Sequence, residues 1–239
     1  MPYGAVIFDI DGTLVDTNDA HVRAWAAAFR KHGEDVTPDR IAPEIGKGGD
    51  KLVPALLGAR GEEKLGDALR ASHAEAFLSI AARTRFRVFP RAEDLLAELR
   101  RRGTPTALAT SSDKRFVDAV MRSAGVDLRD AVDHIVTADD AKESKPAPDI
   151  VQAAVKKLGV PARDCIMLGD TPHDAEACRR AGVAFAALTS GGNTADELRA
   201  AGACGIWRDT AQVLELLDRL LDDCDDLGSG TLKEARQTR

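Results

Sequence analysis

Short apolar runs alternate with amphipathic segments along most of the chain. The first run, residues 5–10, is apolar and ends in carboxylates, which is typical of a strand buried on both faces. Further apolar runs lie at 106–110, 134–137, 164–169 and 183–188. Each follows a helical pattern, and these patterns cover 92–102, 114–123, 148–158 and 175–181. The alternation predicts an α/β fold, a doubly wound Rossmann-like parallel sheet with helices on both faces.

The stretch between residues 16 and 86 breaks this alternation. It shows helical patterns, with Trp25 and Phe29 on one apolar face, and no convincing strand. About 70 residues of this kind are too many for a crossover, which predicts an inserted α-helical cap at 16–86. The Rossmann-like core then comprises 1–15 and 87–221. The polar, aperiodic segment 222–239 predicts a disordered tail.

Composition narrows the class of protein. The 33 Lys and Arg residues against 39 Asp and Glu give a net charge of −6, which argues against a nucleic-acid binder. No apolar run approaches the roughly 18–20 residues of a membrane helix, and the start does not resemble a signal peptide. We therefore expect a cytoplasmic protein with no membrane partner. The cysteines, predicted to be buried or incidental thiols in a reducing compartment, are Cys165, Cys178, Cys204 and Cys224.

Two carboxylates, Asp9 and Asp11, end the first predicted strand. Alternation points their side chains to opposite faces unless the backbone turns, and Gly12 permits a turn. Ligands bind at the carboxyl ends of strands in open α/β sheets, and a purely oxygen ligand set suits Mg²⁺. Because Asp-Gly is also a common turn signal, this pair alone does not decide the function.

Three later segments place polar residues after predicted strands. Thr110 and Ser111 begin a run of hydroxyls that either binds an anion or caps the next helix. Lys145 precedes a proline and is either a solvated loop charge or a point charge for a phosphoryl group. Asp170 gives another acidic strand end, and Asp174 either belongs to the same site or is a first-turn helix charge.

The order of these segments resembles the haloacid dehalogenase-like hydrolase superfamily. FDIDGTLVDT is similar to its first motif, ALATSS to its second, SKPAPD to its third and MLGDTPHD to its fourth. The helical insertion directly after the first motif resembles the family's small α-helical cap. The resemblance covers essentially the whole chain except the tail, and it favours the branch of phosphoglycolate phosphatases and β-phosphoglucomutases.

The resemblance implies a role for each motif residue at a Mg²⁺ site. Asp9 is expected to be the nucleophile and a metal ligand that forms an aspartyl-phosphate. Asp11 is expected to be the general acid–base, with its backbone carbonyl on the metal. Asp170 completes the metal site, and Asp174 orients water or the lysine from outside the ligand sphere.

The second and third motifs imply the groups that hold the phosphoryl oxygens. Thr110 and the N–H of Ser111 would bind these oxygens, and Lys145 would pair with both Asp9 and the phosphate. In the cap, His21 either approaches the active centre or is a structural histidine. The glycine-rich turn 44–52 carries Lys47, a candidate substrate-binding residue.

These roles predict a Mg²⁺-dependent phosphatase, a monomer or homodimer, for a small phosphorylated metabolite such as phosphoglycolate or a sugar phosphate. The first alternative is a β-phosphoglucomutase-like phosphotransferase, but the cap turn lacks the arginine that mutases usually carry and Gly169 stands where they usually have Glu. The second alternative is a phospho-acceptor module without turnover. A dehalogenase is disfavoured, because the family's dehalogenases lack a carboxylate at the position of Asp11 and need no metal.

Overall fold

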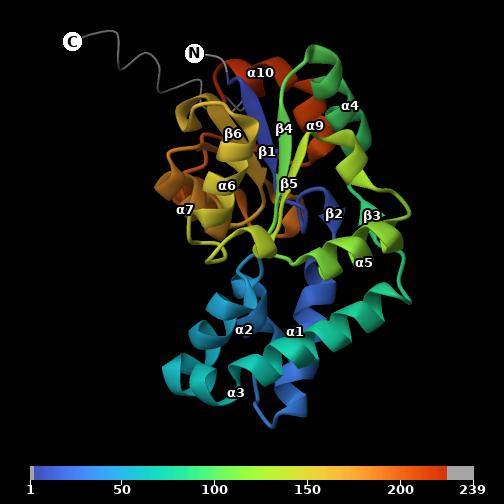
Figure 1. Ribbon diagram of the computed structural model, residues 1–239, viewed down its shortest axis with the longest axis vertical. Coiled ribbons are helices and arrows are strands. Elements are labelled where there is room, and N and C mark those ends of the chain that lie inside the picture. The colour runs from blue at the N-terminus through green and yellow to red at the C-terminus, as the bar shows by residue number, and fades with distance from the viewer. Residues whose placement is uncertain (1–2, 225–239) are drawn as a thin grey trace, which may run out of the picture.

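The computed structural model describes residues 3–224, which form a six-stranded parallel sheet and a helical cap (Figure 1). The strands are β1 (Ala5–Phe8), β4 (Thr106–Ala109), β5 (His134–Val136), β6 (Cys165–Gly169), β7 (Ala184–Leu188) and β8 (Gly205–Trp207). Their order across the sheet is β5-β4-β1-β6-β7-β8, and every pairing is parallel. The order reverses beside β1, which confirms the predicted doubly wound fold and places the site at the carboxyl end of this strand.

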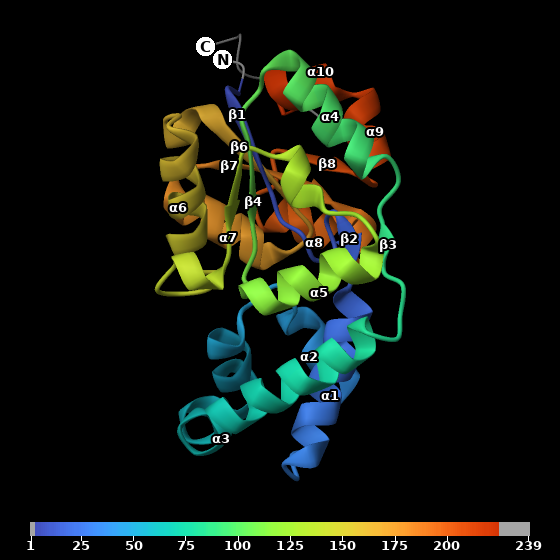
Figure 2. The ribbon, with the colours of Figure 1, turned by 45° about the vertical axis from the view of Figure 1, so that its right-hand side comes forward.

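Helices cover both faces of the sheet (Figure 2). Val6 and Phe8 of β1 belong to one apolar cluster, whereas Ala5 and Ile7 belong to the other, because side chains alternate along a strand. The first cluster includes residues of α4 (Ala92–Arg102), α5 (Lys114–Ala124), α9 (Thr210–Glu215) and α10 (Leu217–Asp222). The second includes residues of α6 (Asp149–Leu158), α7 (Pro172–Ala181) and α8 (Ala195–Ala200). Short 3-10 helices lie at Ala42–Glu44, Leu128–Ala131, Ala138–Asp140, Ala162–Asp164 and Thr189–Gly191.

The inserted cap has an apolar cluster of its own. Its helices are α1 (Asn18–Lys31), α2 (Pro38–Ile41) and α3 (Gly49–Ala81). Trp25 and Phe29 of α1 pack there with Leu52 and Leu69 of α3. The third helix is interrupted at Gly58, whose φ of 71° lies in the left-handed region that glycine tolerates, so it consists of two helical parts.

A two-stranded antiparallel ribbon joins the cap to the core. Strand β2 (Val15–Asp16) pairs with β3 (Arg87–Val88) where the chain leaves the core and where it returns. The sequence pattern does not predict these two-residue strands. The predicted boundaries of the cap, residues 16 and 86, lie at this ribbon. The division of the chain into these domains remains a prediction.

The cysteine prediction is wrong for two of the four residues. Cys204 and Cys224 form a disulfide, because the chain returns after α10 and brings their Cα atoms to 5.7 Å across a separation of 20 residues. Cys165 and Cys178 are free and buried, as expected.

The predicted disordered tail, 222–239, is wrong for its first residues. Asp222 is the last residue of α10, and Cys224 is buried in the disulfide. The rest of the predicted tail, 225–239, lies outside the described residues.

Within residues 3–224, none of the helices has both the length and the apolar character needed to cross a membrane.

Candidate active site

A cavity of about 770 Å³ lies between the cap and the carboxyl ends of the central strands. Asp9, Asp11 and Thr110 line it from the core. His21 and Lys47 line it from the cap. The cavity thus brings predicted residues from both parts of the chain together, and its volume is in the range of small-molecule sites.

The chain turns sharply after β1 and separates the two acidic side chains of the first motif. Gly12 has a φ of 77°, and a Cβ atom there would lie 2.2 Å from the Asp170 carboxylate, so glycine is needed for both conformation and space. Asp9 contacts Lys145, whereas Asp11 contacts Thr17 and other groups near the cap. The two carboxylates therefore have different surroundings and can have different roles.

Lys145 is buried at the bottom of the site, with a side chain only 1% exposed, and is not a solvated loop charge. Its Nζ donates to Asp9 Oδ1 at 2.6 Å and to the Ala109 carbonyl at 2.8 Å. It also lies 2.8 Å from Asp174 Oδ1. Burial by itself would lower the pKa of Lys145, but the charges of Asp174 and Asp9 raise it above the ordinary value. The lysine therefore stays charged and holds two carboxylates in place.

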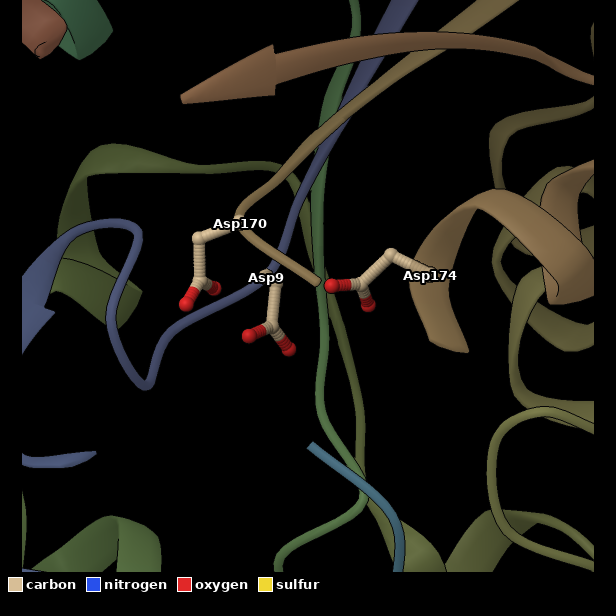
Figure 3. Close-up of side chains that lie close together, drawn as sticks. All are labelled: Asp9, Asp170 and Asp174. Atoms are coloured by element: carbon tan, nitrogen blue, oxygen red, sulfur yellow. The ribbon is translucent and has the colours of Figure 1, made fainter. Parts of the chain in front are cut away.

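Three buried carboxylates meet beside this lysine. Asp9, Asp170 and Asp174 each offer an oxygen, and these oxygens lie within 4.8 Å of one another (Figure 3). Burial, followed by the charge of Asp174, raises the pKa of Asp170 to about 7. Burial also raises the pKa of Asp9 well above its ordinary value, although Lys145 opposes this shift. Burial is the larger cause of both shifts, and the charges of the neighbouring carboxylates add to it, because one lysine does not neutralise three carboxylates.

The donor set fits a hard divalent cation. All three groups are carboxylates, and such ligands suit Mg²⁺ better than they suit soft metals. Asp174 has the most polar contacts of the three, because Lys145 lies 2.8 Å from its Oδ1 and its Oδ2 accepts hydrogen bonds from the Thr171 hydroxyl (2.6 Å) and backbone N–H (3.1 Å). Asp9 and Asp170 are therefore the better candidate ligands, and Asp174 orients Lys145.

Asp11 lies in a network that favours its ionised form. Its carboxylate accepts hydrogen bonds from Thr17 (2.6 Å) and Ser112 (3.1 Å), and His21 Nε2 lies 3.4 Å away. Burial would raise the pKa of Asp11, but the charge and hydrogen bond of His21, with the two hydroxyls, lower it to about 2. Thr17 and Ser112 are the last residues of the first and second motifs, but the sequence pattern gave no indication of their contact with this carboxylate.

His21 belongs to an aromatic cluster that the sequence did not reveal. Its ring stacks on Phe77 with centroids 4.0 Å apart, and its Nδ1 lies 3.3 Å from His73 Nε2. His73 in turn stacks on Trp25 at 4.1 Å. Burial, followed by the charge of His21, lowers the pKa of His73 well below its ordinary value. His21 thus packs in the cap and also approaches Asp11, so both readings of this residue apply.

The hydroxyl run after β4 faces the cavity rather than capping the next helix. The N-cap of α5 is Asp113, whose side chain accepts from the N–H groups of Arg115 and Phe116. Thr110 Oγ1 accepts from the Ser112 N–H at 3.0 Å, and Thr110 and Ser111 line the cavity. The capping role therefore belongs to Asp113, and the two predicted phosphoryl-binding residues line the same cavity as Asp9 and Asp11.

The glycine-rich cap turn rests on the loop that carries Lys145. The Gly48 N–H donates to Ser144 Oγ at 3.1 Å, and this hydroxyl donates to Asp50. A Cβ atom on Gly48 would lie 2.4 Å from Ser144 Oγ, so only glycine permits this approach. Lys47 lines the cavity but forms an ion pair with Glu44. The predicted substrate-binding lysine is thus already neutralised by its own turn.

Together, the doubly wound sheet, the helical cap and the buried carboxylate–lysine centre define a Rossmann-like α/β protein with a capped acidic site. The chain belongs to the haloacid dehalogenase-like hydrolase family, whose family model matches residues 3–182. The resemblance stated from the four motifs is therefore confirmed. As a member of this family the protein is a hydrolase, and phosphatases are among its relatives.

Individual relatives agree with this assignment. The chain is 33% identical over 192 residues to phosphoglycolate phosphatase of Yersinia pseudotuberculosis, covering 79% of this chain and 82% of that one. It is 35% identical over 179 residues, 74% of this chain, to Protein SUPPRESSOR OF QUENCHING 1, chloroplastic, of Arabidopsis thaliana, but spans only 17% of that protein. The crystal structure of a hydrolase from Pseudomonas syringae superposes with a TM-score of 0.84 at 30% identity, covering 90% of this chain and 98% of that one.

Proposed function

We propose that the protein hydrolyses a small phosphomonoester with Mg²⁺ through an aspartyl-phosphate at Asp9. The observation that carries this proposal is the position of Asp9, which lies between Lys145 (2.6 Å) and the Asp170 carboxylate at the base of the cavity. Phosphoryl transfer needs neutralisation of charge beside a positioned nucleophile, and Lys145 next to Asp9 supports both requirements.

In the first step, an Asp9 carboxylate oxygen forms a bond to phosphorus while the bond to the leaving oxygen breaks. Asp11 donates its proton to that oxygen. The negative charge of the bound phosphoryl group raises the pKa of Asp11, which favours the protonated form needed for this step. In the second step, Asp11 accepts a proton from the water that attacks phosphorus, and Asp9 is released.

Five side chains and two backbone groups prepare the site for this reaction. Lys145 reduces the repulsion between Asp9 and an anionic substrate, and Asp174 keeps Lys145 oriented. Thr110 and the N–H of Ser111 hold the phosphoryl oxygens. Asp9, Asp170 and the backbone carbonyl of Asp11 would hold Mg²⁺, which supplies positive charge to the transferring phosphoryl group.

The cap favours a phosphatase over a mutase. A mutase must hold a second phosphate in the cap, but Lys47 and Arg70, which line the cavity from the cap, are already ion-paired, Lys47 with Glu44 and Arg70 with Glu62 and Asp67. The cavity volume of about 770 Å³ accommodates a leaving group as large as a sugar. We therefore infer that the substrate is a monophosphate of a small metabolite, from phosphoglycolate up to a sugar phosphate.

Metal removal tests the enzyme class directly. We expect steady phosphate release from p-nitrophenyl phosphate that EDTA abolishes and added Mg²⁺ restores, because one lysine leaves the carboxylate cluster with excess negative charge. A colorimetric phosphate assay over many turnovers gives the readout. A single equivalent of bound phosphate without further release would instead indicate a phospho-acceptor module, and turnover in EDTA would contradict the metal site.

The Asp11→Asn variant tests the acid–base assignment. An amide cannot donate a carboxylic proton, so we expect a loss of about 10²–10⁴-fold for alkyl phosphates. The loss should be smaller for p-nitrophenyl phosphate, because its leaving group needs little protonation. Steady-state kcat/KM values for both substrates, with the wild type alongside, give the comparison. Normal turnover of alkyl phosphates by this variant would show that Asp11 is not the acid.

A further inference from the structure

Asn18, the first residue of cap helix α1, contacts a candidate metal ligand of the core. Its Nδ2 donates to Asp170 Oδ2 at 2.9 Å, across 152 positions of the sequence. The same nitrogen donates to the Gly191 carbonyl, also at 2.9 Å. One side chain thus joins the cap, the loop after β6 and the loop after β7. No motif of the sequence analysis includes it.

The amide orientation of Asn18 is fixed by its partners. Both the Asp170 carboxylate and the Gly191 carbonyl accept hydrogen bonds only, so the NH₂ group must face them. The amide oxygen Oδ1 is then buried without a hydrogen-bond partner among the described residues. Asn18 Oδ1 is therefore a free acceptor next to Asp170, and a water molecule bound to a cation at that site could donate a hydrogen bond to it.

A local structural role does not explain this contact. An Asn at the start of a helix commonly caps it, but the N-cap of α1 is Thr17, and Asn18 directs its amide into the core. The space is also tight, because a Cβ atom on Gly12 would lie 2.3 Å from Asn18 Nδ2 and one on Gly191 would lie 1.7 Å from Asp170 Oδ2. The two glycines therefore make room for the pairing of Asn18 with Asp170.

We propose that Asn18 is a positioning residue that holds the Asp170 carboxylate in its metal-binding orientation. Thr13 fixes the other oxygen, Asp170 Oδ1, from the core at 2.9 Å. With both oxygens held, the carboxylate loses little freedom when it binds a cation. Partners that orient a ligating carboxylate in this way affect metal affinity as well as activity. This inference rests on the proposed Mg²⁺ site.

The test is the affinity for metal in the absence of substrate. We expect Asn18→Ala to raise the Kd for Mg²⁺ by about 10–100-fold in calorimetric titration, and Mn²⁺ binding followed by electron paramagnetic resonance to show the same shift. Asn18→Leu keeps most of the volume without the donor and should weaken binding equally. High Mg²⁺ concentrations should restore turnover in both variants, which a general folding defect would not allow.

Asp19→Ala is the matched control, because Asp19 lies in the same helical turn, is 79% exposed and pairs with Arg23. It should bind metal as the wild type does. Unchanged metal affinity in both Asn18 variants would overturn the role of Asn18 and leave the metal site intact. A wild-type protein that binds no divalent cation would overturn the metal site and the role of Asn18 with it.

Discussion

The Asp9→Asn variant should lose turnover by about 10⁴-fold or more while keeping its fold, because an amide cannot act as the phosphoryl acceptor. The fold should survive for an electrostatic reason. Asp9 is one of three carboxylates around a single lysine, and burial already raises its pKa. Replacing it with a neutral residue of the same shape removes repulsion, while Lys145 keeps its ion pair with Asp174 at 2.8 Å. The melting temperature without metal should therefore equal or exceed that of the wild type.

Two measurements make this prediction decisive. Phosphate release from several monoesters gives the activity, and an intact mass confirms that the asparagine has not reverted to aspartate. Asp196→Asn, at a carboxylate that is 98% exposed on α8, is the control and should retain full activity. Hydrolysis of any monoester by Asp9→Asn at a wild-type rate would refute the nucleophile assignment.

The central strands are the part of the fold that the sequence predicts best. Strands β1, β4 and β6 lie inside the sheet, and burial on both faces requires a continuous apolar run. Strand β8 does not show this signal, since it is three residues long, begins with glycine and lies at the edge of the sheet. It is held by tertiary packing instead, because Trp207 is buried in the core although the sequence directly after it, Arg208-Asp209-Thr210, is polar. The disulfide was not predictable for a related reason, since Cys204 and Cys224 meet only when the chain has folded.

The contrast between local sequence pattern and tertiary packing also explains which site residues could be predicted from the sequence. Asp9, Lys145 and Asp170 directly follow strands or precede a proline, so topology alone brings them toward one edge of the sheet. The contacts of Asn18 and His73 depend instead on how the cap lies over the core and on how its helices pack. Their sequence neighbours give no such information. The chemistry of the centre is therefore set by local motifs, whereas its fine positioning is set by the cap.

Replacing Lys145 with methionine should lower both stability and activity, whereas Asp9→Asn should lower activity alone. Methionine fills a similar volume but leaves Asp9 and Asp174 buried without their cation. Removing one partner of a buried ion pair costs about 3–5 kcal/mol of the free energy of unfolding. For a domain of this size, the loss corresponds to a melting temperature lower by roughly 6–20 °C. Turnover should fall by about 10²–10³-fold, because the phosphoryl group loses a fixed positive charge.

The effect of Mg²⁺ on this loss of stability tests whether Lys145 and the metal neutralise the same carboxylates. If Lys145 and Mg²⁺ neutralise the same carboxylates, added Mg²⁺ should raise the melting temperature of Lys145→Met by more than it raises that of the wild type. Differential scanning calorimetry in EDTA and in excess Mg²⁺ measures both shifts. Lys142→Met removes an exposed lysine three residues earlier and should melt like the wild type. If Lys145→Met also melts like the wild type in EDTA, the buried carboxylates do not depend on this lysine, and the electrostatic account of the centre fails.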